Sequence, residues 1–353
     1  MRPVVDRLRS FAGRGACTDA ERRAALWLHD ELRSRGHEAW MEARWVRPQA
    51  APVLALGCLL ALGGGLLATA APVPGLVAAA LGALSLAAEE AGFLGPVRAL
   101  FPRRATQHVL TAVPEEGVPL VIAAAYDAPR RGLVLNDRWR RHLRPRGALA
   151  ACGALVAATA AARVAGTDAT WLGAVQLVPT VVLLVAVAAA ADITLSGFSP
   201  GANDNASGVA VALALHDELA RRPPQVLAPA LLLAGAAHAV PRTIARHLRA
   251  ERLDRAVLLE LGPCGAGRPA WAARHPQAQA AAARAGEACT GARRPQADGV
   301  RVVCLDERGL TPRAHQEDDT DADPAAMEAA LDLALAVVDA LDADLARRPV
   351  DPA

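Results

Sequence analysis

Residues 201–208, with the sequence GANDNASG, carry a single carboxylate, Asp204, between flanking glycines. They follow an apolar stretch and open a helical pattern that continues to residue 221. At a helix N-terminus, backbone N–H groups and the helix dipole favour the ionised form of a carboxylate. A fixed, ionised carboxylate suits a divalent cation as a bridging ligand. The alternative is a turn in which Asp or Asn caps the helix, but the order of the surrounding motifs favours a metal site.

That order resembles the di-zinc aminopeptidase, glutamate carboxypeptidase and glutaminyl cyclase family, metallopeptidase family twenty-eight. The family carries a strand ending in His-x-Asp, the Asp-containing loop, a Glu-Glu pair, a later Asp, and a late His before Asp-Thr. The resemblance covers nearly the whole chain outside two apolar insertions, and the Asp204 loop is its most specific match. The matching positions here are Ala125-Tyr126-Asp127, residues 200–208, Ala237-His238, Glu260, and His315 with Asp319-Thr320.

The resemblance implies two metal positions, and only one keeps a full set of ligands. The first corresponds to Ala125, Asp204 and Glu260, which leaves two carboxylates where three protein ligands are usual. The second corresponds to Asp204, His238 and His315, an acceptable zinc trio with an open fourth place. We therefore expect one zinc ion at most, with Glu260 as a further candidate ligand.

The resemblance also implies that the general base is missing. Ala237 stands where the family has the Glu that takes a proton from the metal-bound water. Glu260 is the only candidate substitute. Asp127 and Asp319 are expected to support the ligands without binding the metal, although the family partner of Asp127, the His replaced by Ala125, is gone.

Each of these residues also has a plainer interpretation. His238 can be an ordinary histidine at a strand end, because a one-residue alignment shift is within the error of single-sequence comparison. His315 can belong to a solvated acidic loop, and Asp127 can be a loop carboxylate left without a role. Glu260 closes an apolar strand, where a carboxylate needs a partner or a cleft.

The elements that must position these residues alternate between strands and helices, which predicts an α/β fold with a mostly parallel mixed sheet flanked by helices. Candidate sites then lie at the carboxyl ends of the strands. Asp323 followed by Pro324 predicts the start of a long amphipathic helix. The expected strands are 107–113, 120–124, 226–234, 256–261 and 300–305, and the expected helices are 19–36, 205–221, 241–250 and 324–345.

Two apolar insertions interrupt this pattern. Residues 52–71 are uncharged and long enough to cross a bilayer, and 76–88 return after a Pro-Gly turn. Residues 147–162 and 169–191 form a second pair, although the Ala-rich 147–162 also fits a buried soluble helix. We expect four transmembrane helices in two hairpins. The domain scheme is a peptidase-like domain in three parts, 1–50, 89–146 and 192–353, with hairpins at 51–88 and 147–191.

Arginines flank the hairpins on one side, whereas the far-side turns hold only Arg163. The positive-inside rule then places a multi-pass protein in the cell membrane with its soluble domain in the cytoplasm. The flanking arginines are Arg44, Arg47, Arg98, Arg103, Arg104, Arg138, Arg140, Arg141, Arg144 and Arg146. A net charge of +2 gives no indication of a nucleic-acid partner, so the expected partners are the lipid bilayer and a peptide or protein. The six scattered cysteines predict small buried side chains rather than a disulfide framework.

Three functions fit these observations. The favoured one is a zinc-metallopeptidase-like membrane protein that is catalytically impaired, a pseudopeptidase that acts by binding at the membrane surface. The second is an active mono-zinc aminopeptidase or acyl transferase that uses Asp204, His238 and His315. The third is a membrane scaffold or transporter subunit with a vestigial domain, although its apolar helices carry almost no ionisable residues to mark a transport pathway.

Overall fold

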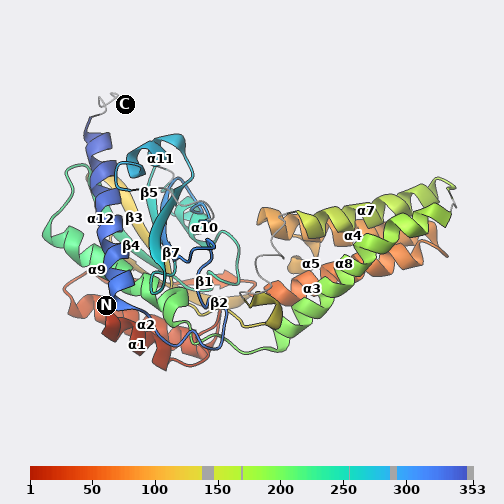
Figure 1. The fold of residues 1–353 in the computed structure, drawn as a ribbon, viewed down its shortest axis with the longest axis horizontal. Coiled ribbons are helices and arrows are strands. Elements are labelled where there is room, and N and C mark those ends of the chain that lie inside the picture. Colours follow the sequence, from red (N-terminus) through yellow and green to blue (C-terminus); the bar gives the residue numbers. More distant parts are fainter. Residues whose placement is uncertain (137–146, 168–169, 254, 287–291, 348–353) are drawn as a thin grey trace. The chain divides into compact units, whose positions relative to one another are not determined.

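The computed structural model describes residues 1–136, 147–167, 170–253, 255–286 and 292–347. Contacts divide the chain into two compact units (Figure 1). The first comprises Met1–Val46, Ala105–Pro129 and Phe198–Ala353, and the second comprises Arg47–Arg104 and Arg130–Gly197. Both parts of the second unit are therefore insertions into the chain of the first.

A seven-stranded mixed sheet forms the centre of the first unit, in the order β1-β2-β4-β3-β5-β7-β6. The strands β4, β3, β5 and β7 are parallel to one another, whereas β2 and β6 are antiparallel to β4 and β7. The parallel strands therefore end at one edge of the sheet, which fits the expected α/β architecture. The strands are β1 (Ala39–Val46), β2 (Arg104–Thr111), β3 (Val118–Ala125), β4 (Leu227–Ala234), β5 (Val257–Leu261), β6 (Arg268–Ala273) and β7 (Gly299–Leu305).

Helices cover both faces of this sheet (Figure 1). Side chains alternate between the faces of a strand, so Leu120, Ile122 and Ala124 of β3 join one apolar cluster while Val121 and Ala123 join the other. The larger cluster includes buried residues of α1, α2, α9 and α12, and the smaller one includes α10. The helices are α1 (Arg2–Ser10), α2 (Asp19–Ser34), α9 (Gly208–Arg221), α10 (Thr243–Ala250), α11 (Pro276–Ala282) and α12 (Pro324–Ala346).

The expected strands and long helices are confirmed with small shifts of their ends. Asp323 caps α12 through its side chain, which accepts the N–H of Ala325 at 3.0 Å. One boundary was wrong: the helix after the Asp204 loop begins at Gly208 rather than at residue 205, because Ala202–Ser207 form an irregular turn. The strand β6 and the short helix α11 were not anticipated from the residues.

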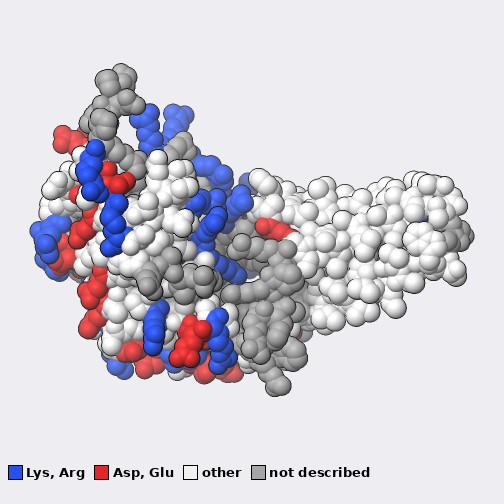
Figure 2. Space-filling model, turned by 45° about the horizontal axis from the view of Figure 1, so that its top comes forward, with Lys and Arg blue, Asp and Glu red and all other residues white. Residues whose placement is uncertain are grey.

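The second unit consists of helices whose outer surface is apolar. They are α3 (Ala50–Leu67), α4 (Pro72–Ala91), α5 (Pro96–Ala99), α7 (Ala148–Val164) and α8 (Thr170–Leu195), with a single helical turn at Leu133–Leu135. Three of them, α3, α4 and α8, are long and apolar enough to cross a membrane by length and composition, and α7 is shorter at 17 residues. Figure 2 shows almost no charged side chains on the visible surface of these helices. Of the flanking arginines, the five between 138 and 146 lie outside the described residues.

Candidate functional site

The turn Ala202–Ser207 lies over the carboxyl ends of β3 and β5. The side-chain amide of Asn205 donates hydrogen bonds to the carbonyl of Ala125 at 3.2 Å and to that of Leu261 at 3.1 Å, the last residues of those two strands. Ligand sites of open α/β sheets occur at this edge. The turn therefore places Asp204 where the sequence analysis expected a site.

Two glycines allow this turn to form. Gly201 has a φ of +66°, a conformation that side chains with a Cβ rarely adopt. A Cβ at Gly208 would lie 2.3 Å from the carbonyl oxygen of Gly262 and 2.3 Å from Oδ1 of Asn205. The second glycine thus allows α9 to begin against the chain that follows β5.

Asp319 holds the turn from the other side. Its fully buried carboxylate accepts the backbone N–H of Asn203 at 2.7 Å and that of Asp204 at 3.0 Å. Burial and the Asp204 carboxylate together raise the pKa of Asp319 to about 6, and the two N–H donors oppose this shift. Asp319 therefore supports Asp204 through hydrogen bonds from the backbone of the turn.

A buried arginine that the sequence analysis missed lies beneath the same turn. Arg14 donates from Nη2 to the carbonyl of Gly201 at 2.9 Å and from Nε to that of Tyr126 at 2.7 Å. Burial lowers its pKa to about 10, although the carboxylates around it oppose this shift. Arg14 thereby joins the chain after β3 to the start of the Asp204 turn.

His238 lies between two carboxylates. Its Nε2 is 3.1 Å from Oδ1 of Asp204, and its Nδ1 is 3.2 Å from Oδ1 of Asp127. The second contact lacks hydrogen-bond geometry and is electrostatic. Burial disfavours the imidazolium, but the charges of Asp127 and Asp204 outweigh burial and raise the pKa of His238 to about 10.

Asp127 is fully buried and does more than contact this ring. Its two carboxylate oxygens accept the backbone N–H groups of Ala237 at 3.0 Å and His238 at 3.1 Å. Asp127 therefore has several contacts, although position 125 holds an alanine where the resemblance implies a histidine. It fixes the segment after β4 and lies beside the imidazole of His238.

His315 approaches the other carboxylate oxygen of Asp204. Its Nε2 lies 3.9 Å from Oδ2 of Asp204, and its ring is 6.4 Å from that of His238, centroid to centroid. Burial opposes the ionisation of Asp204, but His238, His315 and Arg301 hold the pKa of this carboxyl well below its usual range. Asp204 is thus an ionised, buried carboxylate surrounded by nitrogen groups.

Glu260 is engaged by a second residue that the sequence analysis missed, Arg301. Nη1 of Arg301 donates to Oε1 of Glu260 at 2.8 Å, and the backbone N–H of Gln296 donates to Oε2 at 3.0 Å. Both carboxylate oxygens therefore have partners within the protein. Glu260 is therefore one half of an ion pair, and neither of its oxygens is left free to take a proton from a bound water.

The donor atoms fit the two metal positions of the resemblance to different degrees. The first position lacks a donor at Ala125, and its Glu260 is bound by Arg301. The second has suitable donor chemistry in Asp204, His238 and His315. Within the described part of the chain, however, only two other groups of three side chains bring their ligand atoms within 4.8 Å of one another. As arranged here, the second trio is too open to surround one ion.

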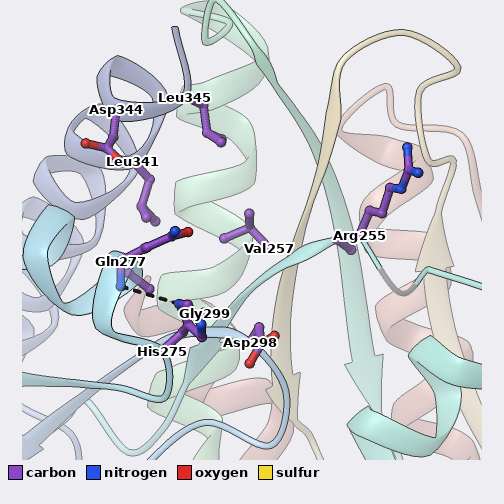
Figure 3. Close-up of a pocket in the computed structure, with 11 residues that line it drawn as sticks. Arg255, Val257, His275, Gln277, Asp298, Gly299, Leu341, Asp344 and Leu345 are labelled. Atoms are coloured by element: carbon purple, nitrogen blue, oxygen red, sulfur yellow. Dashed lines mark hydrogen bonds between the residues drawn. The ribbon is translucent and has the colours of Figure 1, made fainter. Parts of the chain in front are cut away.

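The cavity of about 330 Å³ shown in Figure 3 lies elsewhere. Its lining includes Val257 and Gly299, the first residues of β5 and β7, and Leu341 and Leu345 of α12. It therefore opens at the amino ends of the parallel strands, at the sheet edge opposite Asp204. We do not assign the candidate site to it, because the grouped carboxylates and histidines lie at the other edge.

Comparisons with known proteins agree with the fold. No model of a known protein family matches the chain, and no curated protein matches it. Among solved structures, the zinc aminopeptidase BSAP of Bacillus subtilis has a TM-score of 0.54 at 12% identity, covering 95% of this chain and 93% of that one. The glutaminyl cyclase of Tannerella forsythia has 0.53 at 12%, covering 96% of both chains. A Zn-dependent exopeptidase of Parabacteroides distasonis has 0.53 at 11%, covering 95% of both.

At such identities the similarity concerns the fold alone. The protein has the α/β fold of zinc exopeptidases and glutaminyl cyclases, with a seven-stranded, mostly parallel sheet flanked by helices.

Proposed function

We propose that this protein is a membrane-anchored, catalytically silent relative of the zinc exopeptidases and glutaminyl cyclases, which acts by binding a peptide or protein at the membrane surface. The observation that carries the proposal is that side-chain cations of the protein pair with carboxylates to which the resemblance assigns metal ions. His238 contacts Asp204 and Asp127 at 3.1 and 3.2 Å, and Arg301 binds Glu260 at 2.8 Å.

These ion pairs remove the main electrostatic need for a metal. A buried carboxylate requires a counter-charge or several hydrogen-bond donors. Asp127 and Asp204 share the imidazole of His238, and Glu260 has the guanidinium of Arg301. The protein thereby balances the charge of these groups with its own side chains.

The position of the general base supports the same conclusion. Ala237 has no proton-accepting side chain, and its backbone N–H donates to Asp127. General-base catalysis contributes roughly 10²–10⁴-fold to a typical rate. Glu260, the candidate substitute, has both oxygens occupied. Hydrolysis at the rate of an intact enzyme is therefore not expected.

The second unit supports a membrane location. Large apolar side chains of α8 that include Leu177, Val178 and Leu184 are more than half exposed. An apolar surface of this extent on several adjacent helices fits a lipid environment better than water. The arginine asymmetry of the sequence then favours a cytoplasmic first unit.

Zinc content and activity, measured together, test the proposal. The protein is purified in detergent through a histidine-free tag, beside Asp204→Asn and His315→Ala. We expect no hydrolysis of aminoacyl p-nitroanilides, no cyclisation of N-terminal glutaminyl peptides, and the same zinc content in all three proteins. An activity in the parent that both variants lose would refute catalytic silence.

Binding and topology need their own measurements. A photoreactive amino acid at position 237 should crosslink to a peptide or protein in native membranes, whereas one at Glu328, exposed on α12, should not. Thr167→Cys should react with an impermeant maleimide in intact cells, and Glu116→Cys only after lysis. The reverse labelling pattern would overturn the cytoplasmic placement.

A second candidate function rests on one observation. Asp204 has an imidazole nitrogen on each side, at 3.1 Å from His238 and 3.9 Å from His315. If the two imidazoles moved closer together, these three residues could hold one zinc ion, which would supply Lewis-acid activation of water or of a carbonyl. One equivalent of zinc in the parent, lost in both Asp204→Asn and His315→Ala, would favour this mono-zinc enzyme.

A further inference from the structure

We propose that His37, His216 and Asp217 form a binding site for one divalent cation of the zinc type, separate from the Asp204 site. The two imidazoles and the carboxylate come from segments far apart in the sequence. Their potential ligand atoms all lie within 4.8 Å of one another. This inference does not depend on the proposed function, because it concerns a different part of the first unit.

The end of α2 fixes the position of His37. Gly36 has a φ of +88°, and its N–H bonds to the carbonyl of Arg33 at 3.0 Å. The N–H of His37 bonds to the carbonyl of Leu32 at 3.1 Å. These two bonds form the Schellman motif that ends many helices. The backbone of His37 is therefore set by the helix end and not by a free loop.

Helix α9 supplies the other two side chains. His216 is on its buried side and is 7% exposed, whereas Asp217 is partly exposed. The rings of His216 and His37 meet edge to face, with centroids 4.4 Å apart. Nδ1 of His216 is buried and has no hydrogen-bond partner, while its Nε2 lies 3.5 Å from the hydroxyl of Thr111. A buried ring nitrogen without a partner is costly, and a metal ion would satisfy it.

The distances suit a small cation. Nε2 of His37 lies 2.7 Å from Oδ1 of Asp217. Zinc binds nitrogen and oxygen at about 2.0–2.2 Å, so tetrahedral ligand atoms are about 3.3 Å apart. A widening of about half an ångström would therefore admit the ion. The side chains of His37 and Asp217 are 15% and 20% exposed, which leaves a solvent-facing side for ion entry and for a fourth ligand.

The charges around the cluster also favour a cation. Arg35 binds Oδ2 of Asp217 at 2.6 Å, on the carboxylate oxygen that His37 does not contact, and Glu31 binds Arg35 in turn at 2.7 Å. Metal-binding carboxylates are commonly held by such a partner on their second oxygen. Glu31, Arg35 and Asp217 together carry one net negative charge.

The other group of three with similar spacing, Glu42, His247 and Glu251, does not carry the same inference. Arg44 contacts both glutamates and lies 3.4 Å from Nδ1 of His247. A guanidinium therefore already occupies the place that an ion would need. In the His37 cluster, by contrast, Arg35 approaches only the outer oxygen of Asp217.

The test measures zinc binding to the full-length protein, purified in detergent through a histidine-free tag and stripped with a chelator. Equilibrium dialysis against zinc alone at about 10 µM is compared for the parent, His37→Gln and Asp217→Asn. His29→Gln, which changes a histidine of α2 whose side chain is partly exposed like that of His37, is the matched control, and Asp204→Asn controls for the other site. Circular dichroism confirms that each variant folds.

We expect about one zinc per chain in the parent, in His29→Gln and in Asp204→Asn, with affinity at least about 100-fold lower in His37→Gln and Asp217→Asn. Zinc should also raise the unfolding temperature of the parent but not that of His37→Gln. A parent without zinc, or zinc binding unchanged in the folded His37→Gln and Asp217→Asn variants, would show that the cluster is only an ion-paired network. Zinc lost in Asp204→Asn but kept in His37→Gln would place the metal at the other site and overturn this inference, whereas catalytic silence is tested by the activity assays alone.

Discussion

Arg301 and Glu260 occupy paired register positions on the neighbouring parallel strands β7 and β5, and an ion pair of 2.8 Å joins their side chains. These are the fifth and sixth strands of the sheet, and the residues on either side of Glu260 and Arg301 in each strand are apolar. Two charges in such a place are stable mainly because each is the partner of the other. Glu260 was expected to be a candidate metal ligand, but its carboxylate forms an ion pair with Arg301 inside the protein.

The first prediction concerns this pair. Arg301→Met should lower the free energy of unfolding by about 3 kcal/mol, because it leaves the buried Glu260 carboxylate without its counter-charge. The double variant Glu260→Leu with Arg301→Met should be closer to the parent, since it removes both charges. Chemical unfolding followed by intrinsic tryptophan fluorescence measures the change; Trp271, which pairs with Val302 next to Arg301, contributes to this signal.

Arg268→Met is the control, because Arg268 is an exposed arginine at the start of β6. If Arg301→Met unfolds at the same denaturant concentration as Arg268→Met, the ion pair does not stabilise the sheet. A double variant less stable than Arg301→Met alone would likewise contradict the argument from the unpaired charge.

A second prediction concerns the carboxylate that holds the Asp204 turn. Asp319→Ala leaves the buried N–H groups of Asn203 and Asp204 without acceptors, and it should cost about 1–3 kcal/mol of stability for each group left unsatisfied. Asp318→Ala, at the exposed neighbouring position, should have little effect. Hydrogen exchange at the two amides should accelerate in Asp319→Ala alone. Equal exchange in the two variants would mean that Asp319 does not hold the turn.

Much of the fold could be predicted because its elements have strong local patterns. The apolar run that became β3 is buried on both faces, and α12 combines a capping Asp-Pro with a regular apolar spacing. The strand β6 was missed because it is short, contains Pro269 and buries only two of its six residues. Its place in the sheet depends on pairing with β7, which a local pattern does not reveal.

The site could be predicted only as far as its motifs are local. Asp204 and its flanking glycines form a single motif, and Asp127, His238, His315 and Asp319 were located through their order in the chain. Arg14 was not predicted as a residue of the site because its partners, Tyr126 and Gly201, lie 112 and 187 residues away in the sequence. For Arg301 there was a signal: a charged residue within an apolar strand, beside another such strand that ends in Glu260.

The acid sensitivity of the first unit supplies a third prediction. His108 is 2% exposed, and its Nδ1 accepts the backbone N–H of Gly235 at 3.2 Å. Burial and the neighbouring His247 together lower its pKa from 6.5 to about 4. In the unfolded chain the same group titrates near 6.5. Neutral His108 therefore makes its full contribution to the free energy of unfolding above about pH 6.5. This contribution is lost as the pH falls toward 4, by up to about 1.4 kcal/mol per pH unit.

His108→Gln keeps a hydrogen-bond acceptor for Gly235 but cannot take up the proton. Between pH 6.5 and 4, the free energy of unfolding should change less with pH in this variant than in the parent. This expectation holds even if the two proteins differ in stability at pH 7.5. Unfolding midpoints at half-unit pH intervals measure both slopes. Parallel curves would show that the protonation of His108 is not coupled to unfolding.

The last prediction compares two adjacent glycines of α3. A Cβ at Gly64 would lie 2.2 Å from the backbone nitrogen of Ala79 in α4, whereas a Cβ at Gly63 would meet nothing within 4 Å. The helices α3 and α4 thus touch backbone to backbone at Gly64, a contact that small residues allow in membrane helix pairs.

Replacing each glycine by valine tests this contact. Both substitutions carry the same cost of a β-branched residue in a helix, so the difference in behaviour between the two variants reports on the contact at Gly64 alone. Gly64→Val should force the helices apart and increase proteolysis of the 68–71 turn in membranes, while Gly63→Val should behave as the parent does. Equal protease resistance in the two variants would show that α3 and α4 do not depend on this close approach.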